Sequence, residues 1–174
     1  MRRDGTLAGR RVLPALLRPG IAGERGQRGA ELKGARAVRV VDEKTPAKAA
    51  RAVVKGLVAY NTAKAGKAKY KRFAVSVRDD RDEIRGGIVA YTIWNWCFIE
   101  LLWLDEAARG GGFGTELMQR AEAIAAERGA RHVYVDTFSF QGDGFYQGLG
   151  YETFGELTEF PPGHRRIWLK KDLP

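Results

Sequence analysis

The stretch Arg109-Gly110-Gly111-Gly112-Phe113-Gly114-Thr115 decides how this chain folds. An apolar segment, Cys97 to Leu104, comes before it, and a pattern typical of a helix, Thr115 to Arg128, follows it. Four glycines in five positions let the backbone close tightly around a ligand, because no Cβ obstructs the approach. The N–H groups that open a helix carry partial positive charge, so we expect the turn to bind an anion such as a phosphate.

Two common phosphate-binding motifs do not match this turn. A P-loop carries a Lys before the Ser or Thr that follows its last glycine, and here Thr115 follows Gly114 directly. The dinucleotide fingerprint G-x-G-x-x-G needs a third glycine where this chain has Leu117. The turn does match a third pattern, Arg-x-x-Gly-x-Gly, in which Arg109 is the arginine and Gly112 and Gly114 are the two glycines. A tight strand-to-helix turn without a ligand is the structural alternative.

Composition and charge predict one globular domain with a basic N-terminal extension. The chain has 174 residues, of which 44% are apolar and 29% charged. Residues 1–40 hold ten Lys or Arg and three Asp or Glu, whereas residues 41–174 hold 20 and 18. A domain without a concentrated basic face is a weak candidate for nucleic-acid binding, so no nucleic-acid partner is expected. We expect residues 1–36 to be a disordered extension and residues 37–174 to form the domain.

The same composition bears on the compartment and on metal binding. A single cysteine, Cys97, excludes an internal disulfide framework and suits a reducing compartment. No run approaches the roughly 18 apolar residues of a membrane helix, and the cluster Val12 to Leu17 is too short for a secretory signal. We therefore expect a cytoplasmic protein without a membrane partner. His132 and His164 lack a carboxylate or Cys at ligand spacing, so no metal site is expected.

Hydrophobic periodicity predicts the order β-α-β-β-β-α-β-α-β-β. Because one helix crosses from strand 97–104 to strand 132–138, these two strands should be parallel within a mixed sheet. The other strands are expected at 37–41, 73–78, 84–94, 151–160 and 165–171, and the helices at 45–66, 115–128 and around 145–147.

A second motif, Phe145-Tyr146-Gln147-Gly148-Leu149-Gly150-Tyr151, lies downstream of the predicted strand 132–138. With both motifs in this element order, the chain from Ala37 to Leu173 resembles the GNAT superfamily of acetyl-CoA-dependent N-acetyltransferases. The run from Asp136 to Gln141 looks like a bacterial subgroup of unassigned substrate. The resemblance implies an α/β (α+β) fold: a mixed, mostly antiparallel sheet of six to seven strands, flanked by helices, with a V-shaped split between the fourth and fifth strands.

The resemblance also implies acetyl-CoA as cosubstrate and indicates where it would lie. Its pantetheine arm would pair with exposed backbone of the fourth strand, and its pyrophosphate with N–H groups of the glycine turn. Arg109 would contribute its side chain or act as a structural ion-pair partner. Many members carry Asn seven residues before the family tyrosine, where this chain has Ser139, so that contact is a departure. The cofactor-binding residues expected are Leu102, Trp103, Leu104, Arg109, Gly110, Gly111, Gly112, Phe113, Gly114, Thr115, Ser139 and Tyr146.

An N-acetyltransferase needs a base for the amine proton and an acid for the departing thiolate. Glu100 is the one carboxylate inside the apolar strand, where burial should raise its pKa, and it is the candidate base. A carboxylate that points to solvent is the alternative. Tyr146 matches the family tyrosine near the thiol sulfur and is the candidate acid, the alternative being a core aromatic like Phe145. By family analogy, the N–H of Leu102 would stabilise the oxyanion.

The acceptor is expected to be the primary amine of a small molecule, and its class stays open between polyamine, amino acid, antibiotic amine and peptide N-terminus. Asp136 and Thr137 end the predicted strand 132–138 and are candidates to face it. Many GNAT relatives pair through sheet edges, so a homodimer is one expected assembly. A non-catalytic acyl-CoA-binding module on the same fold is the alternative function. Four aromatic residues either cage a cationic amine or fill the core: Tyr91, Trp94, Trp96 and Trp103.

Overall fold

The computed structural model describes residues 39–174, except the side chain of Asp143, so the predicted extension 1–36 lies outside the described residues. The chain divides into two units: the first ends at Lys64 and the second begins at Ala65. The domain boundary expected at residue 37 stays a prediction. The second unit holds the sheet and the remaining helices.

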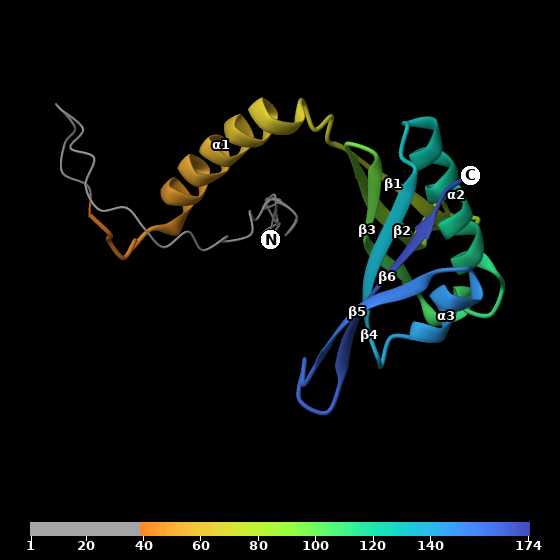
Figure 1. The fold of residues 1–174 in the computed structure, drawn as a ribbon. Helices are drawn as coiled ribbons and strands as arrows, with labels where there is room; N and C mark the ends of the chain where they lie inside the picture. Colours follow the sequence, from red (N-terminus) through yellow and green to blue (C-terminus); the bar gives the residue numbers. More distant parts are fainter. Residues whose placement is uncertain (1–38) are drawn as a thin grey trace, which may run out of the picture. The chain divides into compact units, whose positions relative to one another are not determined.

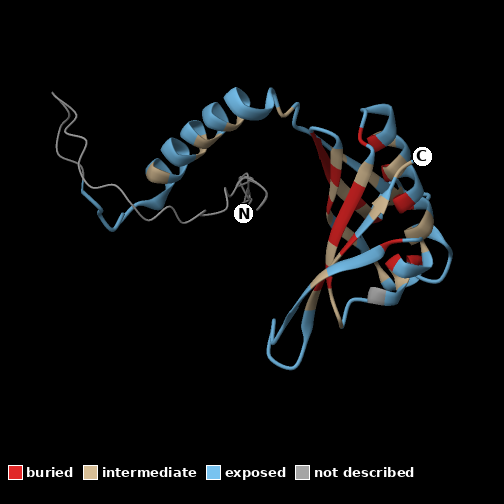
Figure 2. Ribbon diagram, viewed as in Figure 1, coloured by how far each residue is buried: buried red, intermediate tan, exposed pale blue. Residues whose placement is uncertain are grey.

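The first helix, α1 (Pro46–Ala65), forms where the periodicity predicts it. Proline occupies its first position, where a missing N–H costs nothing. Gly66 follows with φ +73°, a conformation that commonly ends helices. None of the residues of α1 is buried, as the absence of red on this helix in Figure 2 shows. Within residues 39–174, no helix is long and apolar enough to cross a membrane.

The strand predicted at 37–41 is wrong in the part that the structure describes. Arg39 to Val41 adopt no strand, and Val40 is fully exposed. A strand is stable only when its N–H and C=O groups pair with a neighbour, and among the described residues no strand pairs with this segment. The sheet therefore has six strands in this part of the chain.

Those six strands form one sheet in the order β1-β2-β3-β4-β6-β5 (Figure 1). The strands β3 and β4 are parallel, as predicted from the helix that crosses between them, and all other neighbours are antiparallel. The predicted ends lie within two residues of the observed ones. The strands are β1 (Lys71–Arg78), β2 (Ile84–Ile93), β3 (Trp96–Leu104), β4 (His132–Phe138), β5 (Glu152–Thr158) and β6 (Arg165–Asp172).

Two helices, α2 (Phe113–Glu127) and α3 (Asp143–Gly148), lie on one face of this sheet (Figure 1). The core lies between α2 and the central strands, where Figure 2 shows the buried positions. The helix buries one stripe of side chains, at the helical spacing that the sequence predicts: Leu117, Met118, Ala121 and Ala125. The sheet contributes Ile88, Ala90, Cys97, Ile99, Val133, Val135, Ile167 and Leu169.

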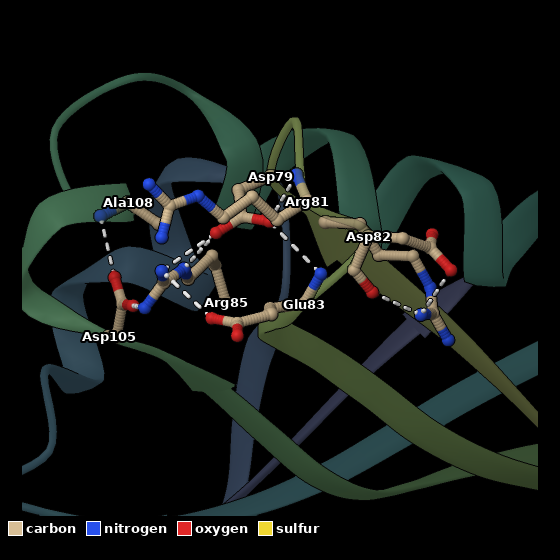
Figure 3. Close-up of polar contacts among 8 residues, drawn as sticks. Asp79, Arg81, Asp82, Glu83, Arg85, Asp105 and Ala108 are labelled. Carbon is tan, nitrogen blue, oxygen red and sulfur yellow. Dashed lines mark hydrogen bonds and ion pairs between the residues drawn. The ribbon is translucent and has the colours of Figure 1, made fainter.

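A charged turn joins β1 to β2 (Figure 3). The carboxylate of Asp79 accepts hydrogen bonds from the N–H groups of Arg81 (2.9 Å) and Glu83 (3.0 Å) and pairs with Arg85 at 2.7 Å. The bond from the Glu83 N–H, followed by that from Arg85, holds the pKa of Asp79 below its usual value. These contacts fix the position of Arg85.

From this turn, Arg85 reaches the segment that follows β3. Its guanidinium lies 3.6 Å from the carboxylate of Asp105, and its carbonyl accepts the Asp105 N–H at 2.9 Å. The Asp105 side chain accepts the N–H of Ala108 at 2.9 Å and so caps the short helix η2 (Glu106–Ala108). The charged turn therefore anchors the segment that leads directly into the glycine turn.

Candidate functional site

The sheet opens between β3 and β4. These strands pair only over Trp96 to Ile99 in β3 and His132 to Val135 in β4. Beyond those residues both strands continue, to Leu104 and Phe138 respectively, without pairing to each other. The V-shaped split expected between the fourth and fifth strands is therefore present, and in the observed numbering it separates β3 from β4.

A β-bulge lies where the split begins. Val89 and Ala90 of β2 are opposite Leu101 and Ile99 of β3, so Glu100 is the extra residue of β3. A bulge leaves its extra residue unpaired and bends the strand. Glu100 thus marks the point at which β3 stops pairing with β4.

A cavity of about 610 Å³ occupies the split. Such a volume suits a small-molecule site. Its walls come from the ends of β3 and β4, the start of α2, the loop after β4 and α3. Seven predicted site residues line it: Glu100, Leu102, Trp103, Leu104, Arg109, Gly114 and Tyr146.

Six predicted residues do not line the cavity, namely Gly110, Gly111, Gly112, Phe113, Thr115 and Ser139. Phe113 instead lines a groove of about 550 Å³ between α2 and β1. The hydroxyl of Ser139 accepts the N–H of Arg165 at 3.2 Å, so this side chain is engaged in holding the loop after β4 to the start of β6. A cofactor contact by Ser139 stays a prediction.

The backbone around the start of α2 favours glycine at three positions. Gly110 and Gly112 have φ values of +76° and +82°, which side chains with a Cβ rarely adopt. Gly112 directly precedes α2, which begins two residues earlier than predicted. A Cβ on Gly114 would come within 3.3 Å of the Phe145 ring, so its absence lets α2 approach α3. The N–H groups of the first helical turn have no partner inside the helix, so an anion at this end of α2 can accept hydrogen bonds from them.

Arg109 links this turn to the end of β3. Its Nε donates to the carbonyl of Leu104 at 3.1 Å. In the part of the chain that the structure describes, no carboxylate forms an ion pair with Arg109, so the structural ion-pair role considered for it is not observed. The arginine therefore carries a positive charge at the rim of the cavity.

Tyr146 presents a buried phenol to the cavity. The residue is 7% exposed, and its ring makes edge contacts with Phe145 (5.1 Å between centroids) and Tyr151 (6.0 Å). No described residue hydrogen-bonds to its hydroxyl, and no buried side-chain polar atom in residues 39–174 is left without a partner, so the hydroxyl opens into the cavity. Burial, with a smaller contribution from the charge of Asp136, raises the pKa of Tyr146 to about 12.

Two carboxylates also line the cavity, one from each side of the split. Glu100 pairs through Oε2 with Nε of Arg72 at 2.8 Å, and Asp136 pairs through Oδ2 with Arg166. Their side chains are 16% and 14% exposed. Glu100 is therefore neither fully buried nor directed into open solvent. Asp136 and Thr137 both line the cavity, and that they face the acceptor stays a prediction.

The four aromatic residues considered as an amine cage are not brought together. Tyr91 is buried, with its hydroxyl 3.4 Å from that of Tyr134, and Trp94 lies in the turn after β2. Trp96 stacks on His132. Of the four, Trp103 lines the cavity and is exposed.

Two reactive side chains outside the cavity, Cys97 and His132, are held by contacts within the fold. Cys97 is buried in the core, and burial raises the pKa of its thiol to about 12. His132 pairs with Asp172 at 2.6 Å, a carboxylate far away in the sequence. Within residues 39–174, no group of three or more His, Cys, Asp or Glu side chains is arranged to hold a metal ion.

Sequence reasoning missed six cavity residues, of which Ile99, Leu101 and Val135 belong to the predicted strands and the other three are Phe140, Gln141 and Phe145. Phe145 stands beside Tyr146 in the second motif, so its place could have been inferred. Phe140 and Gln141 belong to the loop after β4, and no periodicity reports on a loop.

Comparisons with known proteins agree with this geometry. The family model for GNAT acetyltransferases matches residues 47–151. Blasticidin-S acetyltransferase from Streptomyces morookaense is 40% identical over 102 residues, which are 58% of this chain and 75% of that protein. A crystal structure of an acetyltransferase from Bacillus cereus superposes with a TM-score of 0.72 at 28% identity, over 78% of this chain and 98% of the other. An aminoglycoside 6'-N-acetyltransferase complexed with coenzyme A has the same fold, with a TM-score of 0.52 at 23% identity over 59% of this chain and 73% of that one. The chain therefore belongs to the GNAT family of acetyltransferases, and it is an enzyme of the acyltransferase class.

Proposed function

We propose that this protein transfers the acetyl group of acetyl-CoA to a primary amine of a small molecule, by direct attack in a ternary complex. One observation supports this most strongly: a single cavity between two diverging strands is lined by a carboxylate, Glu100, and by a phenol, Tyr146, and it reaches the start of α2. A proton acceptor, a proton donor and an anion site are the three things that this transfer needs.

Acetyl-CoA would occupy the cavity from the glycine turn inward. Between Leu102 and Leu104, β3 pairs with β2 and has no strand partner on the side of β4. Apart from the Leu104 carbonyl, which accepts a hydrogen bond from Arg109, the N–H and C=O groups on that side can pair with the amides of the pantetheine arm. The pyrophosphate would accept N–H groups from Gly110 to Thr115 and face the charge of Arg109. The relative that is complexed with coenzyme A has the same fold, which supports this cosubstrate.

The chemistry follows from the groups around the thioester. Glu100 takes a proton from the ammonium form of the acceptor, and the freed lone pair attacks the carbonyl carbon. The N–H of Leu102 stabilises the resulting oxyanion. The C–S bond then breaks, Tyr146 gives its proton to the departing thiolate, and the new amide loses its second N–H proton to solvent. Tyr146 is reprotonated from solvent, and Glu100 releases the proton that it took from the ammonium to solvent. The products are the N-acetylated amine and coenzyme A as the free thiol.

A thiol-release screen tests this proposal. The full chain is incubated with acetyl-CoA and, separately, butylamine, 1,4-diaminobutane, lysine, a dipeptide, kanamycin and blasticidin S. Blasticidin S is included because a relative at 40% identity is a Blasticidin-S acetyltransferase. We expect at least one amine to release coenzyme A well above the rate of hydrolysis without amine. Release that no amine accelerates, from protein that binds acetyl-CoA, would instead support a binding module.

Gly112→Ala is expected to weaken acetyl-CoA binding by about three- to tenfold. Nothing lies within 4 Å of the added Cβ, so the effect comes from the left-handed backbone, which costs an alanine on the order of 1–2 kcal/mol. Relief of that strain moves the first N–H groups of α2 away from the pyrophosphate. Calorimetric titration with acetyl-CoA measures the change.

Gly155→Ala is the matched control, because Gly155 also has open space around it but no positive φ. Its affinity for acetyl-CoA should equal that of the wild type. If the wild type, Gly112→Ala and Gly155→Ala bind acetyl-CoA with equal affinity, the pyrophosphate does not bind at the start of α2.

A further inference from the structure

The carboxylate of Asp136 is bound by Arg166 through one oxygen, and its other oxygen is available to accept a hydrogen bond. Both Nε and Nη2 of Arg166 converge on Oδ2, at 2.7 and 2.5 Å. No described residue donates a hydrogen bond to Oδ1. Since the side chain lines the cavity and is 14% exposed, this second oxygen can accept a bond from a ligand.

Arg166 itself is firmly placed. Its guanidinium lies 5.4 Å from the ring centroids of Phe138, Phe160 and Trp168, which come from β4, from the segment after β5 and from β6. A planar guanidinium among aromatic faces is stabilised by cation–π attraction and keeps a fixed orientation. The orientation of the Asp136 carboxylate is therefore set by residues outside the cavity.

The two carboxylates of the cavity differ in how they are held. Arg72 is 55% exposed and touches Glu100 through one nitrogen, whereas Arg166 is 31% exposed and touches Asp136 through two. A loosely held carboxylate suits proton transfer, in which its partners change during the reaction. A rigidly held one suits a fixed binding contact.

A primary amine arrives mainly as ammonium at neutral pH, because alkylamines have pKa values near that of lysine, about 10.4. An ammonium needs charge-assisted acceptors when it leaves water for a cavity. Asp136 and Tyr146 line the same cavity, and Tyr146 is the proposed donor to the thiolate. An ammonium on Asp136 would therefore lie beside the reacting groups and across the split from Glu100.

We propose that Asp136, oriented by Arg166, binds the ammonium group of the acceptor through Oδ1 and positions the nitrogen between Glu100 and the thioester. This inference rests on the proposed function and adds the residue that recognises the acceptor. Asp136 is thus a substrate-binding residue, and Arg166 acts through it as a positioning residue.

Asp136→Asn tests the inference with the amine of the screen that has the highest kcat/KM. The asparagine keeps the shape of the side chain and removes its charge, so KM for the amine should rise about tenfold or more. KM for acetyl-CoA should stay within about twofold. Asp136→Glu restores the charge at a displaced position and should recover part of the loss. A merely structural role would change both KM values together with the thermal midpoint, and the glutamate would not restore amine binding alone.

Glu156→Gln is the matched control. Glu156 also pairs with an arginine of β6, Arg165 at 2.6 Å, but it lies outside the cavity. Its KM for the amine should not change. An unchanged amine KM in Asp136→Asn, or an equal rise in Glu156→Gln, overturns the inference.

If Asp136→Asn does not fold, Arg166→Lys replaces it. Lysine keeps the charge but loses the planar fork, so the amine KM should rise while acetyl-CoA binding stays intact, and an unchanged amine KM overturns the inference. Failure of the proposed function looks different, because the wild type would then acetylate no amine of the screen.

Discussion

Tyr146→Phe is expected to lower kcat by about a hundredfold or more while acetyl-CoA affinity changes by less than about twofold. Phenylalanine keeps the ring that packs on Phe145 and Tyr151, so the variant loses only the proton that the thiolate would receive. Steady-state thiol release gives kcat, and calorimetry gives the affinity for acetyl-CoA.

Tyr151→Phe is the control for this variant. The Tyr151 hydroxyl is also buried but donates to Glu122 at 2.9 Å and lies outside the cavity. Its removal should lower stability and leave kcat within a few-fold of the wild type. If Tyr146→Phe and Tyr151→Phe have the same kcat, Tyr146 does not donate the proton to the thiolate.

The pH profile provides a second test of Tyr146. A general acid must be protonated to donate, and a phenol with its pKa raised to about 12 stays protonated throughout the accessible alkaline range. The wild-type kcat should therefore rise as the amine loses its proton and then stay level up to about pH 11. A fall in kcat with a midpoint near 10, the usual tyrosine pKa, would contradict the assignment.

Glu100→Gln is expected to lower kcat/KM at pH 7 by about a hundredfold, because the acceptor would lose the group that takes its proton. Glutamine keeps the size of the side chain at the bulge. The deficit should shrink as the pH rises toward the pKa of the amine, since the fraction of free amine then increases without help from the protein. Rates measured between pH 7 and 10 give this dependence.

Arg72→Gln separates the carboxylate from its ion pair. This variant removes the guanidinium, which is more than half exposed, and leaves Glu100 in place. An exposed pair contributes little to stability, so kcat/KM should fall far less than in Glu100→Gln. Equal losses in the two variants would assign the effect to the ion pair, and a pH-independent loss in Glu100→Gln would assign it to structure.

The sequence predicts most of the fold because the periodic segments are local. Each strand of the second unit, and the helices α2 and α3, lie within two residues of their expected places, and the parallel pairing follows from the crossing of α2; the short helix η2 is not among the predicted elements. The segment around Val40 shows where this reasoning fails. Its apolar residues favour a strand, but a strand also needs a partner, and among residues 39–174 it has none.

The sequence predicts only part of the candidate site. The glycine turn and Tyr146 are recognisable because their motifs are contiguous. The bulge at Glu100 depends on the register with β2, and the contact between Asp136 and Arg166 depends on the pairing of β4 with β6. Ser139 shows the same limit, because its partner Arg165 lies 26 residues away. Such long-range pairing leaves no local pattern.

Titration of the full chain with acetyl-CoA in a calorimeter tests the central claim most directly, which is that the split between β3 and β4 binds this thioester. We predict saturable binding at one site, unchanged in Tyr146→Phe and Asp136→Asn and weakened in Gly112→Ala. The absence of any binding at millimolar acetyl-CoA, measured at two temperatures so that a vanishing enthalpy cannot hide it, would contradict the account.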